Sequence, residues 1–109
     1  MVSYFVRYRG HSGNADEFCD YYESVHAKIL ADFPEIQSLV LHRPAPWTDP
    51  FPVNRGDSAF LAQMVFRSSR DLDAALRSDA RRRAREDFQR FPAFTGEVAH
   101  EAMAGKVIF

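Results

Sequence analysis

The sequence has little cysteine, no long apolar run and no excess of one charge. A single cysteine, Cys19, excludes a disulfide framework within the chain. No apolar stretch approaches the ~18 residues that cross a bilayer, and no signal peptide precedes the first predicted strand. We therefore expect a soluble, cytoplasmic protein with no membrane partner. The formal net charge of −1 gives no general field that would attract nucleic acid.

Several kinds of catalytic site also lack their signature residues. The four histidines are scattered along the chain, at His11, His26, His42 and His100. There is no HExxH motif, no His-x-His pair and no cysteine cluster, so we predict no metal site. Gly10 and Gly13 are too few for a phosphate-binding loop, and no serine nucleophile elbow is present. We predict a protein that uses no cofactor.

Aromatic residues are abundant instead, at 14% of the 109 residues, with ten phenylalanines. This material suffices for one hydrophobic core, and the length corresponds to a single domain over residues 1–109. Arginines at 81, 82, 83 and 85 are interleaved with Asp79, Glu86 and Asp87. That pattern is typical of a solvated helix face rather than a nucleic-acid patch.

The clearest helical signal lies in the stretch 14–34. Asn14 is a natural N-cap with Glu17 three residues later, and Pro34 forbids continuation. At about 100° per residue, the apolar residues form one stripe, and His26 falls near its middle. Tyr22 lies one turn earlier on the same stripe. This position of His26 is the most informative functional feature of the sequence.

A buried imidazole needs partners for its two nitrogens, because an unsatisfied buried polar group costs roughly 1–3 kcal/mol. Two interpretations of His26 remain open from the pattern alone. One is a core histidine bonded to a backbone carbonyl, and the other is a histidine that faces a pocket.

The remaining pattern predicts strands over 2–9, 36–43, 59–66 and 95–103. A second helical region opens at Ser69 with Asp71, is interrupted at Ser78 and ends before Pro92. The order βαββαβ predicts an α+β, ferredoxin-like fold with a four-stranded antiparallel sheet. Strands one and three are apolar on both faces, so we expect two sheets to pack face to face in a homodimer, as a dimeric α+β barrel.

Two segments lie outside this pattern. The stretch 44–58 holds four of the six prolines together with Trp47 and Phe51, which is typical of a lid, an oligomer contact or local packing. The apolar tail 106–109 is predicted to join a sheet edge or a neighbouring subunit.

The chain resembles the EthD family of small dimeric α+β barrel proteins. The matching pieces are the first strand YFVRY, the segment EFCDYYESVHAKIL with its Tyr-x-x-x-His pattern, Phe33-Pro34, and the Ser78-Asp79 break before a helix that ends Phe88-x-x-Phe91. The resemblance implies the fold, and it favours a pocket role for His26. An isomerase of the same superfamily carries a polar partner at or near the position of Leu39, where this chain departs from it.

Proton transfer is the simplest reaction that a histidine in a pocket supports, because its pKa lies near neutrality. We predict His26 and Tyr22 as catalytic residues, although Tyr22 also fits a purely structural role in the core. The predicted substrate-binding residues are Trp47, Arg7, Arg43 and Leu39. Two hypotheses follow when the resemblance is added, since it implies small aromatic or polyketide-like metabolites. One is an isomerase, cyclase or lyase for such a metabolite, and the other is a non-catalytic protein that binds such a molecule in a degradation, polyketide or prodigiosin-type pigment pathway.

Overall fold

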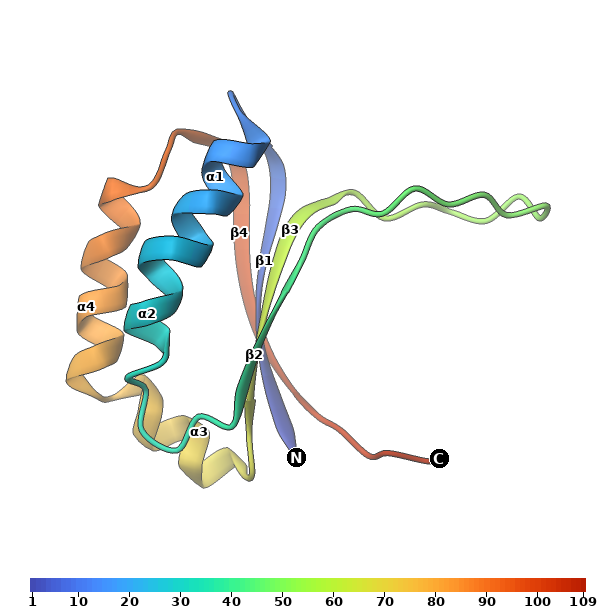
Figure 1. The fold of residues 1–109 in the computed structure, drawn as a ribbon. Helices are drawn as coiled ribbons and strands as arrows, with labels where there is room; N and C mark the ends of the chain where they lie inside the picture. Colours follow the sequence, from blue (N-terminus) through green and yellow to red (C-terminus); the bar gives the residue numbers. More distant parts are fainter.

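The computed structural model describes residues 1–109 in full. Four strands form one antiparallel sheet in the order β2-β3-β1-β4, and the helices cover one of its faces (Figure 1). The strands are β1 (Val2–Ser12), β2 (Ser38–His42), β3 (Ser58–Phe66) and β4 (Phe94–Ala104). The helices are α1 (Ala15–Tyr21), α2 (Ala27–Leu30), α3 (Ser69–Leu76) and α4 (Asp79–Asp87). This is the predicted ferredoxin-like α+β fold.

The first helical segment begins as predicted and then departs from regular α-helix. The Glu17 N–H donates to Asn14 Oδ1 at 3.0 Å, which confirms the N-cap. Between α1 and α2, a π-helical turn, η1 (Tyr22–His26), lets the Ala27 N–H reach the carbonyl of Tyr22, five residues back. The wider turn leaves Val25 39% exposed, although the regular period placed it inward. Tyr22 and His26 remain buried, and π-turns occur frequently at functional sites.

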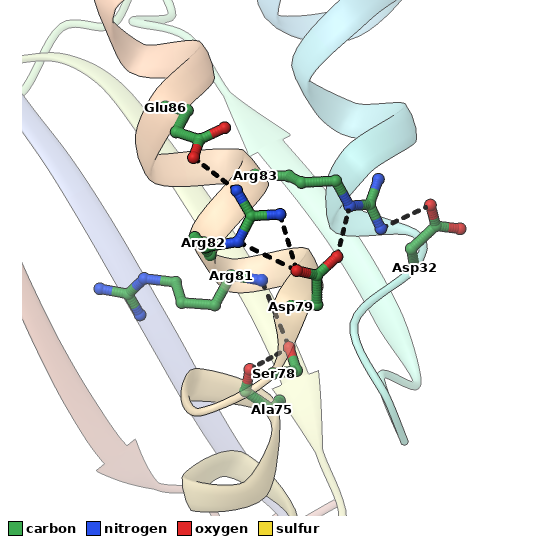
Figure 2. A network of polar contacts seen from close by, with 8 residues as sticks. All are labelled: Asp32, Ala75, Ser78, Asp79, Arg81, Arg82, Arg83 and Glu86. Carbon is green, nitrogen blue, oxygen red and sulfur yellow. Dashed lines mark hydrogen bonds and ion pairs between the residues drawn. The ribbon is translucent and has the colours of Figure 1, made fainter.

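The second helical region breaks where the sequence predicted. The Ser78 hydroxyl accepts from the Arg81 N–H and donates to the Ala75 carbonyl, so it ends α3 and caps α4 (Figure 2). The cap of α3 is Ser68, one residue earlier than predicted, because its Oγ accepts from the Asp71 N–H. After α4, a 3-10 turn, η2 (Phe88–Arg90), leads to the bend before β4.

β1 is three residues longer than predicted, because residues 10–12 continue in the ladder with β4. Gly10 pairs with Gly96, with φ angles of 139° and 146°. A Cβ on Gly10 would lie 2.1 Å from the Thr95 carbonyl oxygen, so only glycine permits this close crossing. β2 is shorter than predicted and begins at Ser38, because the chain first turns through Glu35 at a φ of 61°.

The hydrophobic core lies between the sheet and its helices. Alternate residues of β1, from Val2 to Tyr8, and of β3, from Phe60 to Phe66, point to this side and are buried. They pack against Phe18, Tyr22 and Leu30 of the first helical segment and against Ala80 and Ala84 of α4, among others. None of the helices has the length and apolar character that a bilayer span requires.

The opposite sheet face has no helix over it. It carries apolar side chains next to polar ones, with Val40 42% and Met103 56% exposed. The segment 43–57 forms an arm that leaves the sheet on this side, with its two legs running side by side (Figure 1). The C-terminal tail leaves on the same side without joining a strand, and its last residue, Phe109, is fully exposed (Figure 1).

Candidate functional site

A cavity of about 280 Å³ lies between the helix-covered face of the sheet, the first helical segment and α4. The sheet contributes Tyr4, Val6, Tyr8, Met64, Val98 and His100. The first helical segment and the turn after it contribute Tyr22, His26, Leu30 and Phe33. α4 and η2 contribute Arg81, Ala84, Arg85 and Phe88. The cavity therefore has mostly apolar walls and a few polar groups, which is typical of sites for small organic molecules.

His26 lies in the wall of this cavity and is held there by a buried carboxylate. Its Nδ1 lies 2.9 Å from Oδ2 of Asp87, and the two residues are 6% and 5% exposed. The second oxygen of Asp87 accepts a hydrogen bond of 2.7 Å from the Tyr21 hydroxyl. The ring of His26 also meets that of Phe91 edge-on, with centroids 4.7 Å apart. These contacts fix the imidazole in one orientation.

The contact with Asp87 also decides which nitrogen of His26 is free. An ionised carboxylate only accepts hydrogen bonds, so Nδ1 carries the proton of the neutral ring. Nε2 then has an unshared electron pair and no hydrogen-bond partner in the chain, but it is not fully buried, and His26 is one of the residues that line the cavity. Burial lowers the pKa of His26 below its ordinary value, and Asp87 opposes this effect only in part. The side chain is therefore a neutral base at neutral pH.

We expect the stability of the protein to fall as pH drops below about 6.5. The unfolded chain protonates His26 at its ordinary pKa, whereas the folded protein protonates it only at lower pH. The unfolded state thus binds more protons in this window, and the free energy of unfolding decreases until the folded pKa is passed. Partial desolvation and the charges of Arg81 and Arg85 lower the pKa of His100 too, which adds to the trend.

Urea unfolding at a series of pH values measures this effect. The variant His26→Gln should show a shallower pH dependence of the unfolding midpoint than the wild type. The exposed His11 supplies the control substitution, His11→Gln. An unchanged slope in His26→Gln would contradict the buried, neutral state of this imidazole.

Tyr22 and Tyr8 form the cavity wall next to His26. The Tyr22 ring lies 4.8 Å from that of His26, and Tyr8 meets Tyr22 edge-on at 6.2 Å between centroids. Burial raises the pKa of both tyrosines well above the ordinary value. Both hydroxyls therefore keep their protons and can donate hydrogen bonds at neutral pH.

The arginines of α4 divide into two pairs. Arg82 bonds to Asp79 and Glu86, and Arg83 bonds to Asp79 and Asp32, all on the outer surface (Figure 2). Arg81 points away from this network (Figure 2), and Arg81 and Arg85 both line the cavity. The prediction of a solvated helix face therefore describes Arg82 and Arg83. It misses the other pair, whose spacing of four residues was the available signal.

Asp87 is the other site residue that the sequence analysis missed. It follows Ala80 and Ala84 at helical spacing, so the pattern already placed a carboxylate on the inward side of α4. Its partner His26 is 61 residues away in the chain, and no local pattern pairs the two.

The structure brings Tyr22 and His26 together, but it does not bring the other predicted site residues to this cavity. Trp47 lies on the arm, 48% exposed, with the Arg55 guanidinium 4.0 Å from its ring centroid. Arg7 bonds to the Ser58 hydroxyl from the uncovered sheet face. Arg43 forms an exposed ion pair of 2.7 Å with Asp16, and partly buried Leu39 pairs with Met64 in the sheet. Their predicted substrate contacts stay predictions.

The four histidines remain apart in the structure. No three histidine, cysteine, aspartate or glutamate side chains gather closely enough to hold a metal ion. Cys19 is buried, and burial raises the pKa of its thiol, which disfavours the reactive thiolate form.

Comparison with known proteins identifies a family model and similar structures for this chain. The family model of the EthD domain matches residues 12–95. An ethyl tert-butyl ether D (EthD) family protein from Bacillus halodurans has a similar structure, with a TM-score of 0.75 and 16% identity, over 97% of this chain and 99% of the other. No curated protein matches the sequence.

Two further solved structures share the fold at low identity. SnoaB, a cofactor-independent oxygenase from Streptomyces nogalater, matches with a TM-score of 0.64 and 16% identity, over 97% of this chain and 93% of the other. A dimeric ferredoxin-like protein from Thermobifida fusca matches with a TM-score of 0.61 and 12% identity, over 94% and 89%.

Proposed function

This chain belongs to the EthD domain family, and we propose that it is a cofactor-independent enzyme in which His26 transfers a proton on a small conjugated substrate. One observation carries the proposal. A neutral imidazole with one free nitrogen is oriented by a buried carboxylate, and it belongs to a residue that lines an apolar cavity. A base in this arrangement has the protonation state and the geometry that carbon deprotonation requires.

The proposed reaction begins when His26 Nε2 removes a proton from a carbon next to a substrate carbonyl. The electron pair of the broken C–H bond moves to the carbonyl oxygen, which forms an enolate, and His26 becomes an imidazolium. The negative charge of Asp87 stabilises that imidazolium across the 2.9 Å contact. Returning the same proton to a different carbon completes an isomerisation without any other reactant.

Tyr22 is proposed to assist at the enolate oxygen. Its ring is adjacent to that of His26, and its hydroxyl stays protonated, so it is a suitable hydrogen-bond donor to developing negative charge. SnoaB supports cofactor-free chemistry as an activity of this fold, since it is described as a cofactor-independent oxygenase.

The second candidate is a non-catalytic protein that binds a small hydrophobic or aromatic metabolite in a degradation or secondary-metabolite pathway. The observation that favours it is the character of the walls, since ten of the fourteen lining residues are hydrophobic. Such a cavity holds an aromatic molecule whether or not His26 removes a proton.

A general carbon acid separates the two candidates without knowledge of the natural substrate. Nitrobenzisoxazole is a flat aromatic compound that opens when a base removes its ring C–H proton, and the N–O bond breaks to release a coloured phenolate. We expect the protein to open it faster than an equal concentration of free imidazole does. Saturable binding without any acceleration would favour the binding protein.

We further propose that the protein is a homodimer that joins the uncovered sheet faces. Val40 and Met103 are exposed on this face, and the arm and the C-terminal tail leave on the same side (Figure 1). Trp47 and Phe51, 48% and 73% exposed on the arm, would then lie against the partner subunit. The dimeric state of the Thermobifida fusca protein supports this arrangement.

Light scattering coupled to size-exclusion chromatography tests the dimer. We expect twice the mass of the chain for the wild type and a shift toward monomer for Val40→Glu, which places a charge in the proposed interface. Val25 has a similar exposure, 39% against 42%, but lies on the helical side, so Val25→Glu is the matched control. A monomeric wild type would overturn the proposal.

A further inference from the structure

We distinguish a buried end and an open end of the cavity by the exposure of the residues that line it. Tyr22 and His26, 1% and 6% exposed, form the buried end. At the open end lie Arg85 and His100, which are exposed, and Arg81, which is half-buried. Arg81 and Arg85 are four residues apart on α4, so their side chains leave the helix on the same face.

The two cavity arginines have no acidic partner, in contrast to their neighbours. Arg82 and Arg83 form four ion-pair contacts with Asp79, Glu86 and Asp32, and none of these carboxylates bonds to Arg81 or Arg85 (Figure 2). Asp87, the carboxylate that contacts His26, already uses one oxygen for His26 and the other for Tyr21. The open end of the cavity therefore carries two positive charges that no acidic side chain balances.

The positive charges act on groups inside the cavity. Arg81 lies over the ring of Tyr4, with its guanidinium carbon 5.8 Å from the ring centroid. The charge of Arg85 reaches Tyr8, whose pKa it lowers against the larger effect of burial. An anion at this end would meet two guanidinium groups, while the rest of the ligand would meet apolar and aromatic walls.

We propose that the cavity selects a conjugated ring compound with a carboxylate, and that Arg81 and Arg85 bind this carboxylate at the open end. The planar guanidinium group matches a carboxylate in two-point hydrogen bonding. A volume of about 280 Å³ is near the lower limit for organic-ligand pockets, about 300 Å³, so the ring system is small. This inference names a substrate class for the same cavity, and in that respect it rests on the proposed function.

In this arrangement the arginines act as specificity-determining residues. They hold the charged end of the ligand, so the ring extends toward Tyr22 and His26 at the buried end. The same anchoring would orient a substrate for proton removal or a carried metabolite for release, so the inference can hold whether or not His26 is catalytic.

Naphthoate and naphthamide form a matched pair of ligands for the test, because they have the same shape and differ in charge. We expect titration calorimetry at low salt to show naphthoate binding about 10- to 100-fold more tightly than naphthamide. The double variant Arg81→Gln/Arg85→Gln should lose this preference and keep its affinity for naphthamide. The control Arg82→Gln/Arg83→Gln removes the same charge from the same helix and should keep the preference.

Each outcome decides for or against the inference. Equal affinity of the wild type for the two ligands, or no binding of either at millimolar concentration, would overturn it. An equal loss of preference in the two double variants would also overturn it, because a general charge effect would then explain the result. If naphthoate preference persists in a protein that does not open nitrobenzisoxazole, this inference holds and the enzyme proposal fails.

Discussion

Replacing His26 with glutamine is expected to reduce the opening of nitrobenzisoxazole by about 10²- to 10⁴-fold, the range that a general base contributes. Glutamine has a side chain of similar reach, and its amide N–H group can still donate to Asp87, so the buried carboxylate keeps a partner. It has no group that accepts a proton near neutral pH. The loss should therefore appear in kcat, while the affinity for naphthoate stays close to that of the wild type.

The control for this substitution is His11→Gln, which removes an exposed histidine at the end of β1, outside the cavity. It should leave the reaction rate unchanged. Far-ultraviolet circular dichroism and the unfolding midpoint establish that both variants fold. A folded His26→Gln protein with the wild-type rate would remove the basis for an enzyme and leave the metabolite-binding protein as the remaining candidate.

Replacing Asp87 with alanine is expected to produce the largest loss of stability among the substitutions considered. Asp87 is 5% exposed and satisfies both His26 Nδ1 and the Tyr21 hydroxyl, so its removal leaves two polar groups without a partner. The unpaired imidazole N–H is buried and costs about 1–3 kcal/mol, and the half-buried Tyr21 hydroxyl adds about 1 kcal/mol, which gives a loss of about 2–4 kcal/mol. For a domain of this size the melting temperature should fall by roughly 10–20 °C.

Differential scanning calorimetry measures this change, and Glu86→Ala is the control on the adjacent residue. Glu86 is 56% exposed and pairs with Arg82 at the surface, so its loss should shift the melting temperature little. A second variant, Asp87→Asn, separates charge from hydrogen bonding. Its amide can satisfy both partners but cannot stabilise an imidazolium, so it should stay nearer wild-type stability and still lose activity. Equal melting temperatures for Asp87→Ala and wild type would contradict the buried contact.

The helix and strand order was predictable because each element has a local signal. Asn14 and Ser78 cap their helices through bonds to residues three positions away, and the alternating residues of β1 show its two faces within nine residues. The departures come from interactions between distant segments. β1 extends past Gly10 because Gly96, 86 positions later, permits close backbone contact, and no pattern within β1 reports that partner.

The candidate site, like the fold, was predictable only where a local pattern reports it. The helical period placed His26 and Tyr22 on one buried stripe, and the chain indeed buries both residues at the cavity. The period did not predict the π-turn that carries them. That turn exposes Val25, which a regular helix would bury.

The sequence by itself determined the fold class and the inward position of one histidine, because short-range periodicity and helix caps report which side of each element is buried. Only the tertiary structure decided what that histidine contacts. Asp87 meets it across 61 positions, and α4 turns Arg81 and Arg85 toward the same cavity while Arg82 and Arg83 pair outside. The physical reason is that the spacing of apolar residues along one element indicates which of its side chains are buried. The partners of a buried polar group depend instead on how helices that are distant in the sequence pack together.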